Sequence, residues 1–306
     1  MREINLDIVR VTEAAARAAA TWIGSGDKES ADKAATDAMR SRLNGMDFRG
    51  RIVIGEGIKD KSPGLFAGEM LGKLEGSQNY EVYDIAVDPI EGTRPVANSG
   101  PEAMSVMAVA GENSLFSTPE FYMNKLAYGP EIAKKIHLDI TDPLDKTLKV
   151  VSAVTGKILG KIVVCVLDRP RHEKVIKELR GIGVRIKLIQ DCDVSGAIAT
   201  CLPDSGIDLL YGMGGSPEGV IAACGIKCLR GGFQAQVVKK DFSLADSKVY
   251  SIEDLVKGPC TFAATGITNG SLLKGVRYTS LGAVTHSVFM RYESGTVRWV
   301  TAYHGN

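Results

Sequence analysis

The chain has 306 residues, of which 44% are hydrophobic and 24% are charged, close to the averages for globular proteins. This composition excludes a disordered chain, a collagen-like repeat and a solenoid with an obvious repeat. Lys and Arg together number 37 and Asp and Glu together number 36, so the net charge of +1 argues against general binding of nucleic acids or other polyanions. A locally basic pocket for a small anion is compatible with that balance.

The chain carries no pattern typical of export, a membrane span or structural zinc. Its apolar runs are shorter than the roughly 20 residues that cross a bilayer, and acidic residues occupy the N-terminal segment where a signal peptide is apolar. The six cysteines and four histidines form neither a C-x-x-C nor an H-x-x-x-H pair. We therefore expect a cytoplasmic protein with reduced cysteines and with neither a membrane nor a nucleic acid as partner.

The first 150 residues are predicted to form two helices and then short strands. In chain order, the helices are expected over 4–23 and from about 27 or 30 to 43, and the strands over 51–54, 81–87 and 103–110. Gly24-Ser25-Gly26 ends the first helix. Pro89 is expected to stop the strand over 81–87, because proline lacks the backbone donor that a ladder needs.

After about residue 150, apolar strands alternate with helical segments. The strands are predicted over 161–167, 184–189 and 208–210, and the helices over 172–179, 194–201 and 218–229. This alternation indicates an α/β protein whose parallel or mixed sheet is covered by helices on both faces. A C-terminal antiparallel hairpin is predicted over 286–292 and 296–303. Because no Gly-, Ser- or Pro-rich linker divides the chain, we expect a single unit of two packed halves, 1–150 and 151–306.

Carboxylates gather where the predicted strands end, which is where open α/β sheets carry their chemistry. In the segment Asp88-Pro-Ile-Glu-Gly-Thr93, Gly92 permits a tight turn that brings Asp88 and Glu91 together. Two carboxylates in one turn repel each other unless a cation lies between them, and Mg²⁺ or Mn²⁺ prefers oxygen ligands. A solvated turn capped by Asp88 is the alternative, which the neighbouring Thr93 hydroxyl makes less favourable.

Lys28 and Asp32 lie one turn apart on a predicted helix and share a face, for which a surface ion pair is the ordinary interpretation. The glycine-rich segment before them is not a phosphate-binding P-loop. It lacks the G-K-[ST] ending, and it follows a helix instead of a strand.

The second half of the chain carries candidate anion-binding and hydroxyl-binding groups. Arg169 and Arg171 follow a strand and suit bidentate phosphate recognition. Asp191 and Asp193 follow the next strand and suit sugar hydroxyls or a metal. The glycine-rich segment 211–219 opens a helix whose backbone N–H groups can hold an anion, although most such turns are only structural. Together with the acids of the first half, these groups predict hydrolysis of a phosphate ester on a polyol.

The segment Asp88–Thr93 resembles the D-P-[IL]-[DE]-G-[TS] signature of the lithium-sensitive sugar phosphatases, which include inositol monophosphatases. The chain as a whole is similar to class II fructose-1,6-bisphosphatases from the first helix almost to its end. The ordered motifs that carry this similarity are GDKESAD (26–32), IVIGEG (52–57), DIAVDPIEGT (84–93), FYMNKL (121–126), DRPRHE (168–173), DCDVSGAIAT (191–200), GGSPEGV (214–220) and FAATGIT (262–268).

The resemblance implies metal-dependent hydrolysis of the 1-phosphate of fructose-1,6-bisphosphate to fructose-6-phosphate and inorganic phosphate, a reaction of gluconeogenesis. Sedoheptulose-1,7-bisphosphate, which shares the C1 end, is an additional candidate substrate. The implied fold is a layered α-β-α-β-α sandwich, and the implied assembly is a homo-oligomer, either a dimer or a tetramer. The implied cofactor is Mg²⁺ or Mn²⁺.

The resemblance also implies the roles of individual residues. The metal ligands would be Asp32, Glu56, Asp88, Glu91 and Glu218. Thr93, aided by Asp60, would orient or deprotonate the attacking water, and Lys28 would support the reacting phosphate. The substrate contacts would be Glu91, Gly92, Thr93, Tyr122, Arg169, Pro170, Arg171, Asp191, Cys192, Asp193 and Gly215. The expected mechanism is direct attack by metal-activated water, and Thr93 as the nucleophile is the alternative that stays open.

Several positions depart from the family pattern. Cys192 stands where the family usually has Gly, Ile58 stands where many members have an acid, and Arg169 replaces the Lys of some members. Only twelve residues separate Gln236 from Val249, where relatives have a longer and largely helical insert. None of these departures removes an expected metal ligand.

Two other functions remain as alternatives. The first is an inositol- or nucleotide-phosphate phosphatase of the same superfamily, which the paired arginines and the D-x-D segment disfavour. The second is a non-catalytic phosphosugar-binding protein, which the intact set of five metal-binding positions disfavours.

Overall fold

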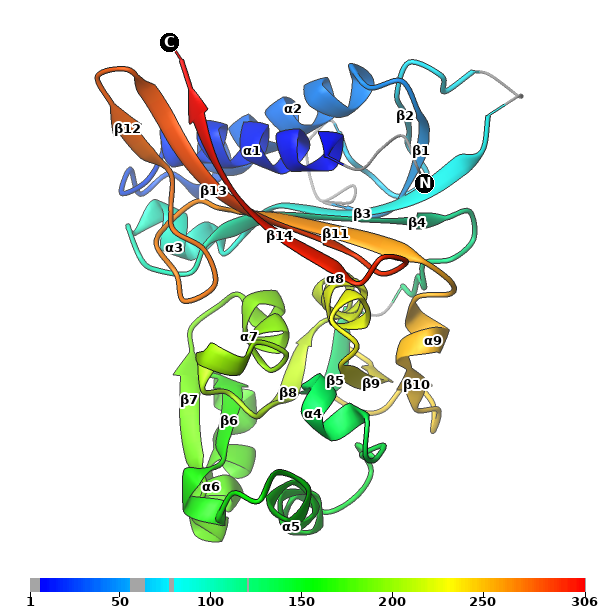
Figure 1. Cartoon of the computed structure of the whole chain (residues 1–306), viewed down its shortest axis with the longest axis vertical. Helices are drawn as coiled ribbons and strands as arrows, with labels where there is room; N and C mark the ends of the chain where they lie inside the picture. The colour runs from blue at the N-terminus through cyan, green and yellow to red at the C-terminus, as the bar shows by residue number, and fades with distance from the viewer. Residues whose placement is uncertain (1–5, 56–63, 77–79, 120, 306) are drawn as a thin grey trace. The chain divides into compact units, whose positions relative to one another are not determined.

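Figure 1 shows a computed structural model of the chain, which describes residues 6–55, 64–76, 80–119 and 121–305. The protein is a mixed α/β protein with two mixed sheets. It divides into unit 1, which comprises Met1–Ser117 and Val256–Asn306, and unit 2, which comprises Thr118–Leu255. These bounds differ from those of the halves 1–150 and 151–306, because the last strands of the chain return to the first sheet. The expected single sugar-phosphatase unit of two packed halves stays a prediction.

Unit 1 is built on an eight-stranded sheet. Its strands are β1 (Arg49–Ile54), β2 (Met70–Leu71), β3 (Val82–Glu91), β4 (Met104–Gly111), β11 (Cys260–Gly266), β12 (Arg277–Thr279), β13 (Gly282–Arg291) and β14 (Thr296–His304). The order is β12-β13-β11-β4-β3-β1-β2, and β14 pairs with β13. Only β1 and β3 pair in parallel among these described strands. The helices of unit 1 are α1 (Asp7–Ala20), α2 (Lys28–Asn44) and α3 (Thr93–Ala97).

Helix α1 packs closely on the unit 1 sheet because the residues that face the sheet are small. Ala15, Ala16 and Ala19 are fully buried, and α1 contacts β3, β4, β11 and β13. Hydroxyl groups under the helix satisfy one another: Thr265 Oγ1 lies 2.8 Å from Thr12 Oγ1 and 2.8 Å from Ser287 Oγ. Buried polar atoms are tolerated there because they are hydrogen-bonded.

Unit 2 contains a six-stranded mixed sheet. Its strands are β5 (Tyr122–Tyr128), β6 (Val163–Leu167), β7 (Arg185–Ile189), β8 (Leu209–Gly215), β9 (Gly232–Val238) and β10 (Tyr250–Ser251), in the order β10-β9-β5-β8-β6-β7. The pairs β6–β7 and β6–β8 are parallel, and the others are antiparallel.

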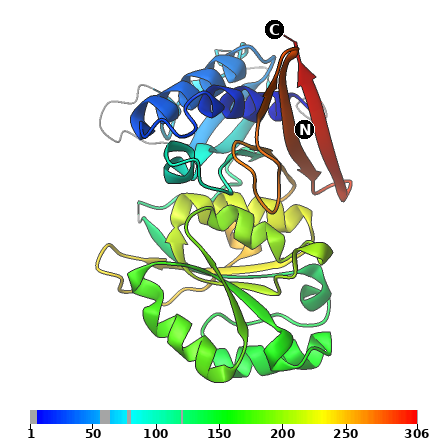
Figure 2. The same cartoon turned by 90° about the vertical axis from the view of Figure 1, so that its left-hand side faces the viewer.

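Helices cover both faces of the unit 2 sheet, as predicted. They are α4 (Pro130–Ala133), α5 (Leu144–Thr155), α6 (Glu173–Ile182), α7 (Asp193–Ala199), α8 (Ser216–Cys228) and α9 (Ile252–Leu255), with 3₁₀ turns η1 (Leu159–Lys161), η2 (Pro170–His172) and η3 (Pro203–Ser205). Figure 2 shows α7 and α8 on one face of the sheet and α5 and α6 on the other. No helix of the described residues is long and apolar enough to span a membrane.

One predicted boundary is wrong. The strand expected over 81–87 does not stop at Pro89, since β3 continues to Glu91. Its ladder with β4 shifts register between Asp88 and Glu91, and Pro89 lies inside that irregular stretch. A bulge is one of the few places in a sheet that tolerates a proline, because a regular ladder bond is interrupted there.

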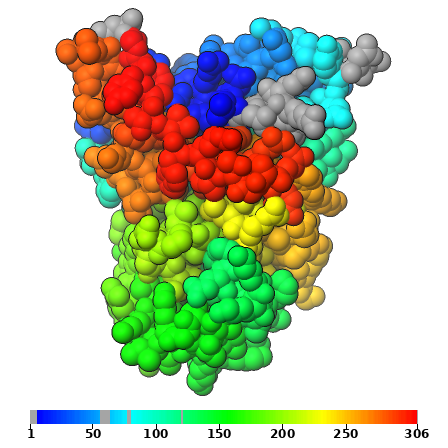
Figure 3. Space-filling view, in the orientation of Figure 1, coloured from blue at the N-terminus to red at the C-terminus, as the bar shows by residue number. Residues whose placement is uncertain are grey.

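The C-terminal hairpin of β13 and β14 is confirmed by nine paired positions from Arg291↔Thr296 to Ala283↔His304. Figure 3 shows β14, drawn in red, at the surface of unit 1. Its Trp299 and Tyr303 side chains are 54% and 80% exposed. Strand β14 therefore adds little to the core and serves mainly to cover the backbone edge of β13.

Asp84 on β3 organises one end of the unit 1 sheet. Its side chain is fully buried, and Arg51 Nη2 donates to its Oδ1 at 2.6 Å. The backbone N–H groups of Ser114 and Leu115 donate to its Oδ2 at 2.8 and 3.1 Å. Both carboxylate oxygens are engaged within the fold, so Asp84 is a structural residue of the motif that also contains Asp88.

We predict that Asp84→Ala lowers the free energy of unfolding by about 2–4 kcal/mol, because it leaves two buried N–H groups without their acceptor and Arg51 without its counter-ion. The control is Arg10→Ala, which removes the exposed Arg10–Asp7 pair of α1 and should cost less than about 1 kcal/mol. Urea unfolding followed by circular dichroism measures both values. Equal, small losses would contradict the structural role of Asp84.

Candidate functional site

One set of predicted site residues lies where β3 ends and α3 begins. Asp88 and Glu91 belong to β3, Gly92 is the N-cap of α3, and Thr93 is its first residue. The backbone N–H of Ile90 donates to Asp88 Oδ1 at 3.0 Å, and Glu91 is buried. The tight turn predicted at Gly92 is confirmed by its φ of +97°, a conformation that glycine adopts without steric cost.

The N-terminus of α2 is tied to the same place. The backbone N–H of Gly24 donates to the carbonyl oxygen of Val96 at 2.9 Å, and that of Gly26 donates to Ala97 at 3.0 Å. Lys28 is the first residue of α2, and Asp32 follows one turn later. These backbone bonds attach the helix that carries Lys28 and Asp32 to the helix that begins at Thr93.

Asp32 is half-buried, and burial raises the pKa of its carboxyl group. Within the described part of the chain, no group donates a hydrogen bond to it, and the surface ion pair with Lys28 is not formed. Burial disfavours the ionised form of a carboxyl group that has no cation beside it. A divalent cation would supply that charge, so the chemistry of Asp32, Asp88 and Glu91 fits a metal that prefers oxygen ligands.

Two further predicted site residues lie outside the described residues. They are the metal ligand Glu56 and Asp60, which is predicted to aid Thr93. Within the ranges that the structure describes, no group of three or more His, Cys, Asp or Glu side chains is gathered closely enough to hold a metal. The five-carboxylate ligand set therefore stays a prediction.

The second set of predicted site residues lies along one edge of the unit 2 sheet. Arg169, Pro170 and Arg171 follow β6, Asp191, Cys192 and Asp193 follow β7, Gly215 ends β8, and Tyr122 begins β5. Because β5 runs antiparallel to β8, Tyr122 pairs directly with Gly215. The topology thus gathers residues that are far apart in the sequence at the end of the sheet where β6, β7 and β8 terminate.

The two arginines at this edge have different partners. Arg169 forms an ion pair with Asp191 through Nη2 and Oδ1. The guanidinium carbon of Arg171 lies 5.4 Å from the centre of the Tyr122 ring, and its Nε and Nη2 donate to the carbonyl oxygen of Met213 at 3.2 and 2.9 Å. Burial lowers the pKa of Arg171. A guanidinium that has lost part of its hydration is well suited to bind a phosphate group.

Lys125 is a member of this set that the sequence analysis missed. It lies on β5 with 1% of its surface exposed, and its Nζ is 2.6 Å from Oδ2 of the buried Asp193. A Cβ at Gly214 would lie 1.9 Å from the same carboxylate oxygen, so this position has no room for a side chain. The sequence offers one signal, a lysine inside an apolar strand, but it does not indicate which acid is the partner.

Glu218 lies in the first turn of α8, and its carboxylate covers the N-cap residue Gly215. A Cβ on Gly215 would lie 2.0 Å from Glu218 Oε2. An acidic side chain at a helix N-terminus is favourable, but it occupies the place where a bare anion would bind. The anion cradle predicted over 211–219 stays a prediction.

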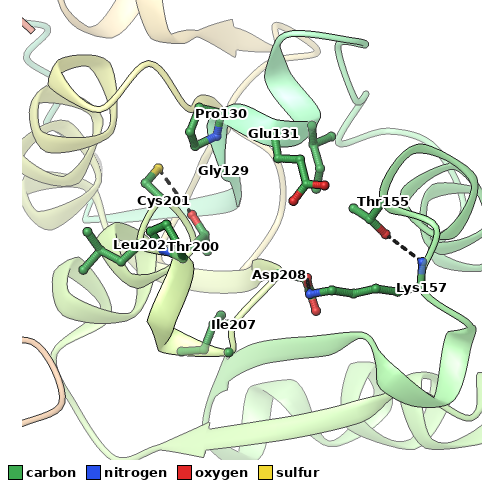
Figure 4. A pocket seen from close by; sticks show the side chains of 13 residues that line it. Gly129, Pro130, Glu131, Thr155, Lys157, Thr200, Cys201, Leu202, Ile207 and Asp208 are labelled. Carbon is green, nitrogen blue, oxygen red and sulfur yellow. Dashed lines mark hydrogen bonds and ion pairs between the residues drawn. The ribbon is translucent and has the colours of Figure 1, made fainter.

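One cavity of unit 2 does not coincide with the predicted site. It has a volume of about 140 Å³ and lies between the start of α4, the end of α5 and the segment that precedes β8 (Figure 4). Its charged lining consists of Glu131 and the ion pair between Lys157 Nζ and Asp208 Oδ1, 2.5 Å apart. A cavity of about 290 Å³ in unit 1, lined by Ile23, Ser99 and other residues, also contains no predicted site residue.

Cys192 lies at a turn whose backbone conformation favours glycine. It is the N-cap of α7 and adopts the left-handed conformation with a φ of +67°. Residues with a Cβ are strained in this region, whereas glycine is not. The thiol is almost completely buried.

We predict that Cys192→Gly is more stable than Cys192→Ala by about 1 kcal/mol, the cost of placing a Cβ in the left-handed region. Both variants lose the thiol, so the difference between them isolates the backbone strain. The free energies of unfolding in urea give this difference. An alanine variant as stable as the glycine variant would show that no strain is stored at this turn.

The chain matches a known family over almost its whole length. Residues 2–304 match the family model described as "Bacterial fructose-1,6-bisphosphatase, glpX-encoded". The chain is 40% identical over 326 residues to "Fructose-1,6-bisphosphatase class 2" of Haemophilus influenzae, which covers 99% of this chain and 96% of that protein. It is also 40% identical to proteins named "D-fructose 1,6-bisphosphatase class 2/sedoheptulose 1,7-bisphosphatase" of Microcystis aeruginosa, over 332 residues, and Trichodesmium erythraeum, over 333 residues, with 98% of this chain and 96% of each protein covered.

Proposed function

From the premise that the chain belongs to the bacterial, glpX-type class 2 fructose-1,6-bisphosphatase family, we propose that it hydrolyses the 1-phosphate of fructose-1,6-bisphosphate. The products are fructose-6-phosphate and inorganic phosphate. The names of two relatives include sedoheptulose-1,7-bisphosphatase, and we extend the proposal to that substrate. Metal dependence is a property of the family, and for this chain we propose Mg²⁺ or Mn²⁺.

The observation that carries the proposal is the set of side chains that follow β6 and β7 in the unit 2 sheet. Arg171 is partly desolvated and stacks on the Tyr122 ring, and Arg169 is nearby in sequence. These cations are suited to bind the phosphate group that the reaction leaves intact. Asp191 and Asp193 provide carboxylates that accept hydrogen bonds from sugar hydroxyls. An inositol monophosphate has no second phosphate to occupy the arginines, so these residues favour a sugar bisphosphate over the alternative from the same superfamily.

We assign the metal and the chemistry to the acidic set. Asp32, Asp88 and Glu91, with Glu56 and Glu218, are the proposed metal ligands. When bound, a divalent cation neutralises phosphoryl oxygens and lowers the pKa of water. The Thr93 hydroxyl would pass its own proton to Asp60 as it takes a proton from the attacking water, and the Lys28 ammonium group would stabilise the charge that builds up on the phosphoryl group.

We assign the rest of the substrate to unit 2. Tyr122, Arg169 and Arg171 bind the 6-phosphate, and Asp191 and Asp193 bind sugar hydroxyls. The proposed backbone contacts are at Pro170, Cys192 and Gly215 in unit 2 and at Gly92 in unit 1. The layered α-β-α-β-α sandwich, a homo-oligomer and a cytoplasmic location are the remaining parts of the proposal, on the grounds of the family resemblance.

We predict that removal of divalent cations abolishes phosphate release. The proposed carboxylates repel one another without a cation, and phosphate monoester hydrolysis is too slow without a large reduction of its barrier. Release of inorganic phosphate from fructose-1,6-bisphosphate is measured after chelation and after addition of Mn²⁺ or Mg²⁺, with inositol-1-phosphate as the comparison substrate. Full activity in excess chelator would contradict the metal assignment, and a preference for inositol-1-phosphate would contradict the substrate.

We predict that Arg171→Ala raises KM for fructose-1,6-bisphosphate by roughly 10–100-fold. This factor corresponds to the free energy lost with one charge-assisted hydrogen bond. The 6-phosphate keeps its charge throughout the reaction, so the effect falls mainly on KM and less on kcat. Arg185→Ala, which changes an exposed arginine of β7, is the control and should leave KM unchanged. An Arg171→Ala enzyme with wild-type KM would show that the segment 168–173 is only a structural turn.

A further inference from the structure

His172 ends the turn η2 and is almost completely buried. Its Nδ1 lies 2.7 Å from the carbonyl oxygen of Leu167 at the end of β6, and its Nε2 lies 2.7 Å from the backbone nitrogen of Met213 in β8. A carbonyl oxygen only accepts and a backbone N–H only donates. The partners therefore assign the hydrogen to Nδ1 and leave Nε2 as the acceptor, which is a neutral imidazole in a single tautomer.

The backbone of Met213 links His172 to Arg171. Its N–H donates to the imidazole, while its carbonyl oxygen accepts both hydrogen bonds from the Arg171 guanidinium. Gly212 makes room for the ring, since a Cβ there would lie 3.0 Å from His172 Nε2. The imidazole thus holds the Met213 backbone in place. The Met213 carbonyl oxygen in turn orients the Arg171 guanidinium over Tyr122.

We propose that neutral His172 is a positioning residue that holds the Met213 backbone in place, so that Arg171 is oriented for the remote phosphate of a sugar bisphosphate. The inference rests on the proposed function for one step, namely that Arg171 binds that phosphate. His172 itself contacts Leu167 and Met213 and is not assigned a contact with substrate.

The surroundings of His172 favour the neutral form that this arrangement needs. Burial lowers the pKa of the imidazole, and the charges of Arg171 and Arg169 lower it further, while the hydrogen bond to Leu167 and the charge of Asp193 act in the opposite direction. The net pKa lies below the usual value of 6.5. At neutral pH the ring is uncharged; as the pH falls through the lowered pKa, Nε2 gains a hydrogen that faces the Met213 N–H. The hydrogen bond is then lost, and KM rises.

Two amide variants of His172 distinguish the hydrogen bond at Nε2 from the hydrogen bond at Nδ1. In His172→Gln the side-chain oxygen reaches the position of Nε2 and accepts from Met213, whereas in His172→Asn the amide nitrogen lies at the position of Nδ1 and keeps only the donor to Leu167. Each variant loses one buried hydrogen bond, so we expect similar losses of stability in urea.

The metal-loaded variants are expected to differ in KM for fructose-1,6-bisphosphate. His172→Asn should raise KM about tenfold, whereas His172→Gln should stay within about threefold of the wild type and lose the rise of KM at acid pH. Equal KM values for the two variants would overturn the inference. If Arg171→Ala raises KM and His172→Asn does not, only this inference fails; if Arg171→Ala has no effect, the phosphate assignment fails instead.

A measurement on the unmodified enzyme keeps the test independent of variant folding. In ¹⁵N-histidine NMR at neutral pH, the His172 signal, identified by its loss in His172→Gln, should show a protonated Nδ1 and an unprotonated Nε2. A ring protonated at Nε2, in the neutral or the charged form, would overturn the inference.

Discussion

The buried ion pair between Lys125 and Asp193 is the constraint on which the site of unit 2 depends. Removing two charges from water costs several kcal/mol each and is compensated only when the partners stay in close contact. The pair joins β5 to the start of α7, and the Lys125 stem continues past α8, where a Cβ on Gly219 would lie 3.1 Å from Lys125 Cε. Movement of β5 away from the start of α7 would leave a buried charge unpaired, so the ion pair fixes the relative positions of these two elements.

Three glycines of β8 each lie against a side chain from another element. The imidazole of His172 lies against Gly212, the Lys125–Asp193 pair lies against Gly214, and the Glu218 carboxylate lies against Gly215. A Cβ at Gly214 or Gly215 would lie within 2.0 Å of a carboxylate oxygen. Glycine in a strand marks the close approach of another group. In this strand the approaching groups are the side chains of His172, Asp193 and Glu218.

The predicted site residues of unit 1 include the carboxylates Asp32, Asp88 and Glu91, and local backbone geometry sets where their elements begin and end. The irregular register between Asp88 and Glu91 frees this part of β3 from a regular ladder with β4, and Gly92 then turns the chain into α3. The backbone bonds from Gly24 and Gly26 hold α2 beside that turn. The backbone geometry thus sets the positions of Asp88 and Glu91, which we propose as metal ligands.

Local patterns in the sequence predicted much of this fold. The spacing of apolar residues located α1, α2 and the alternating elements from β6 to α8, since one buried helix stripe or strand is visible within a short window. The acids and arginines at strand ends were predicted for the same reason, because the ends of neighbouring parallel strands share one edge of the sheet.

Features that depend on distant partners were not predictable in this way. Lys125 and Asp193 are 68 positions apart, and no spacing rule connects them. The strands β5, β9 and β11 were not predicted, and the return of β11–β14 to the first sheet left no linker that would mark the bounds of the units. The glycines of β8 indicated a turn for an anion, because the side chains that require them come from other parts of the chain.

The central claim is that the cations of unit 2 bind the remote phosphate without a divalent metal. Its most direct test is calorimetric binding of fructose-6-phosphate to the protein in excess chelator. If unit 2 holds the remote phosphate with its own cations, fructose-6-phosphate binds without a divalent metal, whereas inorganic phosphate at the same concentration does not. Binding of fructose-6-phosphate that appears only after Mg²⁺ or Mn²⁺ is added would contradict this claim.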